Sequence, residues 1–194
     1  MELNAVAISE AIGRRSAAHG GEEAILGAVV YPLVAEHGAE AVLAELVTKK
    51  GDPLVASALA YAARLAGLRL TDMFSADEIV AAALDYLGTV GAPTKSSIAH
   101  GLRHGNWAWS ALFLHHPGDS AADFDDEEHF RLVLELIERA PWDNDVLWMI
   151  GDGPLAHAAA DEARFDELNE LMKTNPKLAL IWRLMEVDWP HGTP

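Results

Sequence analysis

The chain has 194 residues, 51% of them hydrophobic, and its 30 acidic and 14 basic side chains give a formal net charge of −16. This apolar content is too high for a disordered chain, and the acidity disfavours binding to nucleic acid or to an anionic membrane surface. Because the chain contains no cysteine, it has no disulfide, no thiolate nucleophile and no cysteine-based zinc site.

The first quarter of the chain predicts three helices, over residues 3–18, 22–37 and 39–49, separated by glycines. Pro32 lies inside the second helix and should kink or break it. The longest uncharged apolar run, residues 24–35, is shorter than the roughly 20 residues that cross a membrane. The N-terminus also lacks the basic segment of a signal peptide, so we expect a cytoplasmic protein that does not bind membranes.

Two further helix starts are marked by their capping residues. Asp52 followed by Pro53 is a typical N-cap with proline at the first helical position, and Gly67 should end that helix. Ser75 and Glu78 have the spacing of a capping box, in which each side chain bonds the other residue's amide. Apolar residues at helical spacing follow that box and predict a helix there.

Histidines and acids between residues 100 and 119 are the candidate metal ligands. His100 and His104 are four residues apart on a predicted helix and therefore share one face. Imidazole and carboxylate groups suit Zn²⁺, Mn²⁺ or Fe²⁺, so a divalent metal has this candidate ligand set: His100, His104, His115, His116 and Asp119. The segment lacks the glutamate of an HExxH motif, and the alternative is a pair of surface histidines near a helix end.

Two tryptophans follow on the next predicted helix. Trp107 and Trp109 are two residues apart, so they cannot both face one core stripe. One of them is therefore expected at a helix junction or on an exposed patch, as an aromatic anchor for a partner or for self-association. The alternative is packing between short helices.

Acidic residues crowd the segment after residue 117. Residues 117–125 are small, polar and acidic, and they form a candidate linker. The acids at the next helix start suit either helix capping with a solvated face or the binding of a basic protein; the candidates are Asp123, Asp125, Asp126, Glu127 and Glu128. They do not match the spacing of an EF-hand loop.

The stretch WMIGDGPLAH, residues 148–157, resembles a ligand loop but predicts a corner between two helices. Gly151 should end one helix in a left-handed conformation, and Asp152 or Gly153 should cap the next, with Pro154 at its first position. The chain contains no nucleophile elbow, phosphate loop or dinucleotide fingerprint. No catalytic or cofactor-binding residue is therefore predicted.

Part of the second half resembles a known family. The segments Glu135-Leu136-Ile137-Glu138 and 148–155, followed by helices to Trp189, are similar to an uncharacterised bacterial helical family, a domain of unknown function. That family has a Gly-Pro-Leu helix junction and a closing tryptophan, and the resemblance covers residues 130–189. Ala156 and His157 depart from it, since acidic residues are expected there. The resemblance implies a helical fold and a bacterial origin, and no activity.

No segment alternates like a strand, so the sequence predicts an all-α protein. We expect about ten short helices in an irregular α-α bundle or superhelical array, forming one domain over residues 1–194 with a candidate sub-boundary near 117–125. The favoured hypothesis is a non-enzymatic, protein-binding chain that neutralises a basic partner, as immunity-type proteins do. The alternatives are a metal-dependent hydrolase and a self-assembling structural protein, and a homodimer is favoured over a monomer.

Overall fold

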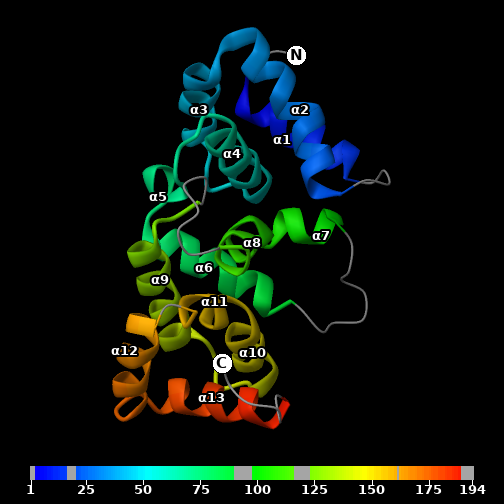
Figure 1. The fold of residues 1–194 in the computed structure, drawn as a ribbon. Helices are drawn as coiled ribbons and strands as arrows, with labels where there is room; N and C mark the ends of the chain where they lie inside the picture. Colours follow the sequence, from blue (N-terminus) through cyan, green and yellow to red (C-terminus); the bar gives the residue numbers. More distant parts are fainter. Residues whose placement is uncertain (1–2, 17–20, 90–97, 116–122, 161, 189–194) are drawn as a thin grey trace. The chain divides into compact units, whose positions relative to one another are not determined.

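The protein is all-α, as expected, and no strand occurs in the part of the chain that the structure describes (Figure 1). The computed structural model describes residues 3–16, 21–89, 98–115, 123–160 and 162–188. The chain divides into two compact units, Met1–Trp109 and Ser110–Pro194. This division falls inside a helix and ahead of residues 117–125, where composition suggested a sub-boundary.

The first unit contains seven complete helices and the start of an eighth within the described residues. Their bounds are α1 Ala5–Arg15, α2 Glu22–His37, α3 Ala39–Val47, α4 Pro53–Leu65, α5 Leu70–Met73, α6 Ala76–Leu87, α7 Ile98–Arg103 and α8 Asn106–Phe113. Of the two expected effects of Pro32, a kink or a break, the break is wrong, because α2 is continuous. Pro32 is exposed, so water can reach the carbonyl that its missing amide leaves unpaired.

Helix α4 is the centre of the first unit and packs against α1, α2, α3, α5 and α7. Eight of its residues are buried, and five of these are alanine: Val55, Ala56, Ser57, Ala58, Leu59, Ala60, Ala62 and Ala63. Such small side chains let neighbouring helices approach α4 closely from several sides. The buried Ser57 hydroxyl is satisfied, since it lies 3.0 Å from the Leu102 carbonyl oxygen.

The capping residues act as the sequence predicts. Asp52 accepts hydrogen bonds from the amides of Leu54 and Val55, at 2.9 and 3.1 Å, and so starts α4. Ser75 and Glu78 form the expected capping box at the start of α6. Gly67 has a φ of 68° just after α4, the left-handed conformation that glycine adopts most easily.

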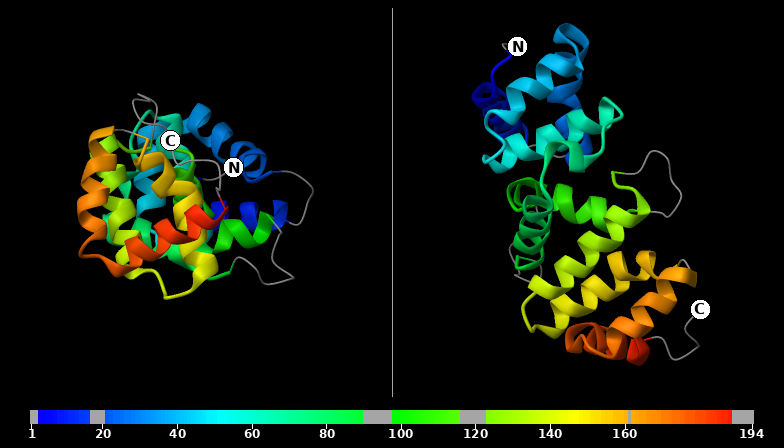
Figure 2. Two further views of the ribbon diagram at one scale, coloured as in Figure 1. Left: turned by 60° about the horizontal axis from the view of Figure 1, so that its bottom comes forward. Right: turned by 90° about the vertical axis from the view of Figure 1, so that its left-hand side faces the viewer.

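The second unit begins within α8 and contains the later helices (Figure 2). Their bounds are α9 Asp126–Arg139, α10 Asn144–Ile150, a π-helical turn Gly151–Leu155, α11 Ala156–Ala158, α12 Glu162–Met172 and α13 Pro176–Asp188. Helix α13 packs against α9, α10, α12 and the π turn, and α11 packs against α9.

The predicted corner at Gly151 is wrong, because the chain continues helically through it. Gly151 has φ −64° and ψ −54°, which is ordinary right-handed helix. The Ala156 amide donates to the Gly151 carbonyl five residues earlier, which widens this turn into a π helix. An α-helix would require an amide at Pro154 and would push its ring against the Ile150 carbonyl, so the wider turn relieves both problems.

The two glycines of this turn permit close packing. A Cβ at Gly151 would lie 2.7 Å from Ile181 Cγ2 and 2.9 Å from Met185 Sδ, both on α13. A Cβ at Gly153 would lie 2.7 Å from Cε2 of the Phe113 ring. The sequence Gly-Asp-Gly-Pro therefore serves helix–helix contact, and its glycines are not needed for backbone reversal.

Within the described ranges, no single helix is both long and apolar enough to cross a membrane. The pair α2 and α3 reaches that length and composition only together, with a bend of 119° between them.

Candidate functional site

The histidine pair predicted from sequence lies in the first unit. The ring centroids of His100 and His104 are 4.1 Å apart, and His104 Nδ1 lies 3.1 Å from Asp85 Oδ2. The two residues thus share one side of the helix, as their spacing predicts. Across the ranges the structure describes, no group of three or more histidines and acids is arranged to hold a metal ion.

The other predicted metal ligands belong to the second unit. His115 follows α8 and is buried, and its Nε2 lies 3.0 Å from Asp126 Oδ1. His116 and Asp119 lie outside the described residues.

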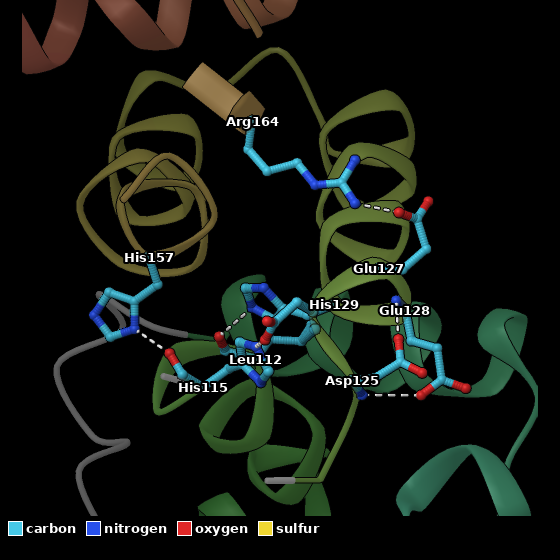
Figure 3. A network of polar contacts seen from close by, with 9 residues as sticks. Leu112, His115, Asp125, Glu127, Glu128, His129, His157 and Arg164 are labelled. Atoms are coloured by element: carbon cyan, nitrogen blue, oxygen red, sulfur yellow. Dashed lines mark hydrogen bonds and ion pairs between the residues drawn. The ribbon is translucent and has the colours of Figure 1, made fainter. Parts of the chain in front are cut away.

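His115 belongs to a cluster of three histidines, with His129 and His157, that we call the histidine cluster (Figure 3). The rings of His115 and His129 stack, with centroids 4.1 Å apart and an interplanar angle of 17°. His157 Nδ1 lies 2.6 Å from the His115 carbonyl oxygen and His129 Nε2 lies 2.9 Å from the Leu112 carbonyl oxygen, so both nitrogens carry hydrogens and donate. The cluster therefore joins the end of α8 to α9 and α11.

Burial is the main cause that lowers the pKa of His129 to about 4, and the neighbouring His115 contributes to the same shift. His115 donates from Nε2 to Asp126 Oδ1, which leaves Nδ1 as its other ring nitrogen. That Nδ1 is buried and has no hydrogen-bond partner among the described residues. A buried ring nitrogen without a hydrogen-bond partner reduces the stability of the core around it.

Most of the predicted partner-binding acids are used inside the second unit. Asp125 accepts from the Glu128 amide at 2.8 Å, and Glu128 accepts from the Asp125 amide at 3.0 Å, which closes a capping box. Asp126 pairs with His115, and Asp123 is half-buried. The structure therefore favours the helix-capping interpretation of these acids.

Glu127 is also engaged, by Arg164 on α12. Arg164 donates to Glu127 and to Glu167, and both hydrogen bonds raise the pKa of its guanidinium, with Glu127 having the larger effect. The guanidinium carbon lies 4.6 Å from the centroid of the Phe130 ring. Arg164 thereby holds α12 against the first turns of α9 through charge and cation–π contact.

Trp107 and Trp109 are not exposed anchors, and the expectation that one of them lies on the surface is wrong. Each is 7% exposed. Trp107 stacks on Phe74 with centroids 4.2 Å apart, and Trp109 packs near Tyr86 at 6.4 Å. The packing alternative therefore describes these two residues.

Within the described residues, the exposed tryptophans are two that the sequence did not single out, Trp142 and Trp148, which are 64% and 37% exposed. Three exposed aspartates lie beside them in sequence, and together the five form what we call the acidic aromatic face: Trp142, Asp143, Asp145, Trp148 and Asp152. Asp145, Trp148 and Asp152 are spaced three and four residues apart, which places them along one side of a helix. That spacing is a signal the sequence did contain.

Of the three carboxylates of the acidic aromatic face, only that of Asp143 has a hydrogen-bond partner within the described residues. Asp143 caps α10 by accepting from the amides of Asp145 and Val146. The side chains of Asp145 and Asp152 form no ion pair or hydrogen bond within the described residues. Lys177 Nζ lies 5.5 Å from the Trp142 ring centroid while donating to the carbonyls of Glu138 and Ala140, so this indole already accommodates a cation.

No protein-family model matches this chain, and neither a curated protein nor a solved structure was found to be similar to it. The resemblance of residues 130–189 to a bacterial helical family therefore stays a prediction.

Proposed function

We propose that this chain is a non-enzymatic protein that binds a basic partner protein through the acidic aromatic face of its second unit. A cytoplasmic neutraliser of a basic toxin or effector is the biological role that fits such a surface. The main observation that supports this proposal is that two exposed tryptophans, Trp142 and Trp148, lie close in sequence to aspartates that form no ion pair within the described residues.

The aromatic part of the face supports recognition of a cation. A guanidinium or ammonium group is attracted to the face of an indole, and more strongly when water is excluded. Lys177 over Trp142 illustrates this contact inside the chain itself. Tryptophan is also, with tyrosine and arginine, enriched among the residues that dominate binding energy at protein interfaces.

The charge of the face supports a basic partner over an acidic one. Asp145 and Asp152 flank Trp148 on one helix side, so an arginine stacked on that indole would lie near carboxylates. The overall charge of −16 would in addition speed the approach of a basic protein through long-range attraction.

The competing hydrolase hypothesis gains no support from the described residues, where no metal-holding group of three or more histidines and acids is found. The self-assembly hypothesis remains as an alternative use of the same exposed tryptophans. Light scattering of the free protein separates it from partner binding.

The proposal is tested by calorimetric titration with a synthetic peptide of alternating arginine and glycine, and with a glutamate–glycine peptide of the same length. We expect only the arginine peptide to bind, and its affinity to fall in about 0.5 M salt because exposed charges are screened there. The double variant Asp145→Asn, Asp152→Asn should weaken that binding about tenfold, and Trp148→Ala should weaken it by a similar factor.

The matched control is the double variant Glu23→Gln, Glu40→Gln, which removes the same charge from exposed positions of the first unit. It should leave the affinity within about twofold of the original. Equal weakening by both double variants would mean that net charge alone attracts the peptide, and the proposed face would be wrong.

A further inference from the structure

The first unit contains a pocket that the proposed partner-binding function does not use. Its volume is about 300 Å³, which lies at the lower end of the range for small-molecule sites. Among its lining residues are Lys50, Phe74, Glu78, Asp85, Arg103 and Trp107. All of them belong to the first unit, so the pocket is independent of the acidic aromatic face.

One part of the pocket is apolar. Phe74 and Trp107 stack at 4.2 Å with an interplanar angle of 28°, and both also line the pocket. Pro53, Ala56 and Ala81 add small apolar surface. Because these groups are held by packing, the wall is already formed before any ligand arrives.

The pocket also presents both signs of charge. Lys50 is neutralised internally, since its Nζ lies 2.9 Å from Glu78 Oε2 and 3.3 Å from the Met73 carbonyl. Arg103 is exposed and forms no ion pair within the described ranges. Asp85 offers a carboxylate of which one oxygen, Oδ2, binds His104.

The combination of an apolar wall with charged groups of both signs favours one class of ligand. A ligand with only negative charge would be repelled by a protein of net charge −16, and a ligand with only positive charge would meet the guanidinium of Arg103. A zwitterion avoids both costs. We propose that the pocket binds a free apolar amino acid: Arg103 pairs with its carboxylate, Asp85 with its ammonium group, and the Phe74–Trp107 wall packs against its side chain.

The proposal is tested by an NMR titration of the whole chain with L-phenylalanine, read at the indole N–H signals. For a ligand of about twelve heavy atoms we expect a dissociation constant on the order of 1 mM. The Trp107 signal should move, while those of Trp142 and Trp148 should not. No change at about 10 mM ligand would overturn the proposal.

Two analogues test the need for both charges. 3-Phenylpropionate lacks the ammonium group and phenethylamine lacks the carboxylate, and each should bind about tenfold more weakly than L-phenylalanine. Equal binding of either analogue would show that the pocket does not recognise a zwitterion.

Variants locate the ligand. Arg103→Gln should weaken L-phenylalanine about tenfold, while Arg131→Gln, an exposed arginine of the second unit, should leave it unchanged. Ala81→Phe fills the pocket from an exposed position of α6 and should also weaken binding about tenfold. Binding that survives Ala81→Phe in a folded protein would place the amino acid elsewhere and overturn the proposal.

Discussion

The cores of the two units contain different kinds of side chain. In the first unit, alanine-rich α4 packs among its neighbours, and the buried hydroxyl of Ser57 has a hydrogen-bond acceptor. In the second unit, the described core contains two buried imidazoles, His115 and His129, whose rings stack. Packing should therefore dominate the stability of the first unit's core, whereas the stability of the second unit's core should also depend on the protonation of His129.

The largest effect should come from opening a cavity in the first unit. Leu59 is fully buried on α4, so Leu59→Ala should lower the free energy of unfolding by about 3 to 4 kcal/mol at any pH between 5 and 8. Denaturant unfolding measures the loss, and hydrogen exchange of α4 peptides assigns it to this unit. Leu65→Ala is the control, because Leu65 is 41% exposed and should lose less than about 1 kcal/mol. Similar losses at both positions would contradict the central role of α4.

Acid should destabilise the second unit through His129. The pKa of His129 is lowered from 6.5 to about 4 in the folded chain, so between these pH values the unfolded chain takes up a proton that the folded chain does not. Stability is therefore present above pH 6.5 and falls as the pH is lowered toward 4, by up to about 3 kcal/mol. Hydrogen exchange at pH 7 and pH 4.5, corrected for intrinsic rates, should show the loss in α9 peptides first. His129→Gln keeps a donor for the Leu112 carbonyl and should remove this pH dependence; a first unit that loosens equally would rule out the assignment.

A glycine-to-alanine substitution should destabilise the first unit, at Gly105, more than the second unit, at Gly153. Gly105 has a φ of 74°, and a Cβ there would lie 2.7 Å from the backbone carbon of Ala82, so Gly105→Ala should cost roughly 2 to 3 kcal/mol. Gly153 would instead meet the ring of Phe113, which is 37% exposed and can move. Gly153→Ala should therefore cost only about 1 kcal/mol. Thermal unfolding of both variants decides this order, and a larger loss at Gly153 would mean that the Phe113 ring is fixed.

The smallest effect should be equal in the two units, since both use a capping box. Ser75 starts α6 and Asp125 starts α9 with the same reciprocal bonds. Ser75→Ala and Asp125→Ala should each cost about 1 kcal/mol, measured by urea unfolding at pH 7. A loss at Asp125 several times larger would show that this end of α9 also supports the histidine cluster.

Features of the fold set by neighbours in sequence were predictable. The starts of α4 and α6 follow from Asp52 with Pro53 and from Ser75 with Glu78, because capping bonds reach only two or three residues. The all-α class follows from the same local signals.

Features set by distant residues were not predictable. Gly151 was expected to end a helix, yet its role depends on Ile181 and Met185, some thirty residues later. Trp107 is buried because Phe74 stacks on it, and the spacing of the two tryptophans carries no information about that partner. The candidate sites have the same limitation: the acids at the start of α9 were recognised, but the pairing of Asp126 and Glu127 depends on the distant residues His115 and Arg164.

The π turn has a consequence for the direction in which the next helix faces. A π turn holds one residue more than an α turn, and one residue corresponds to about 100° of rotation around a helix axis. The extra residue in Gly151–Leu155 therefore sets the angular phase of α11, and with it the side from which His157 reaches the His115 carbonyl. A chain one residue shorter here would keep its helices and its hydrophobic composition, and it would point this histidine away from the cluster.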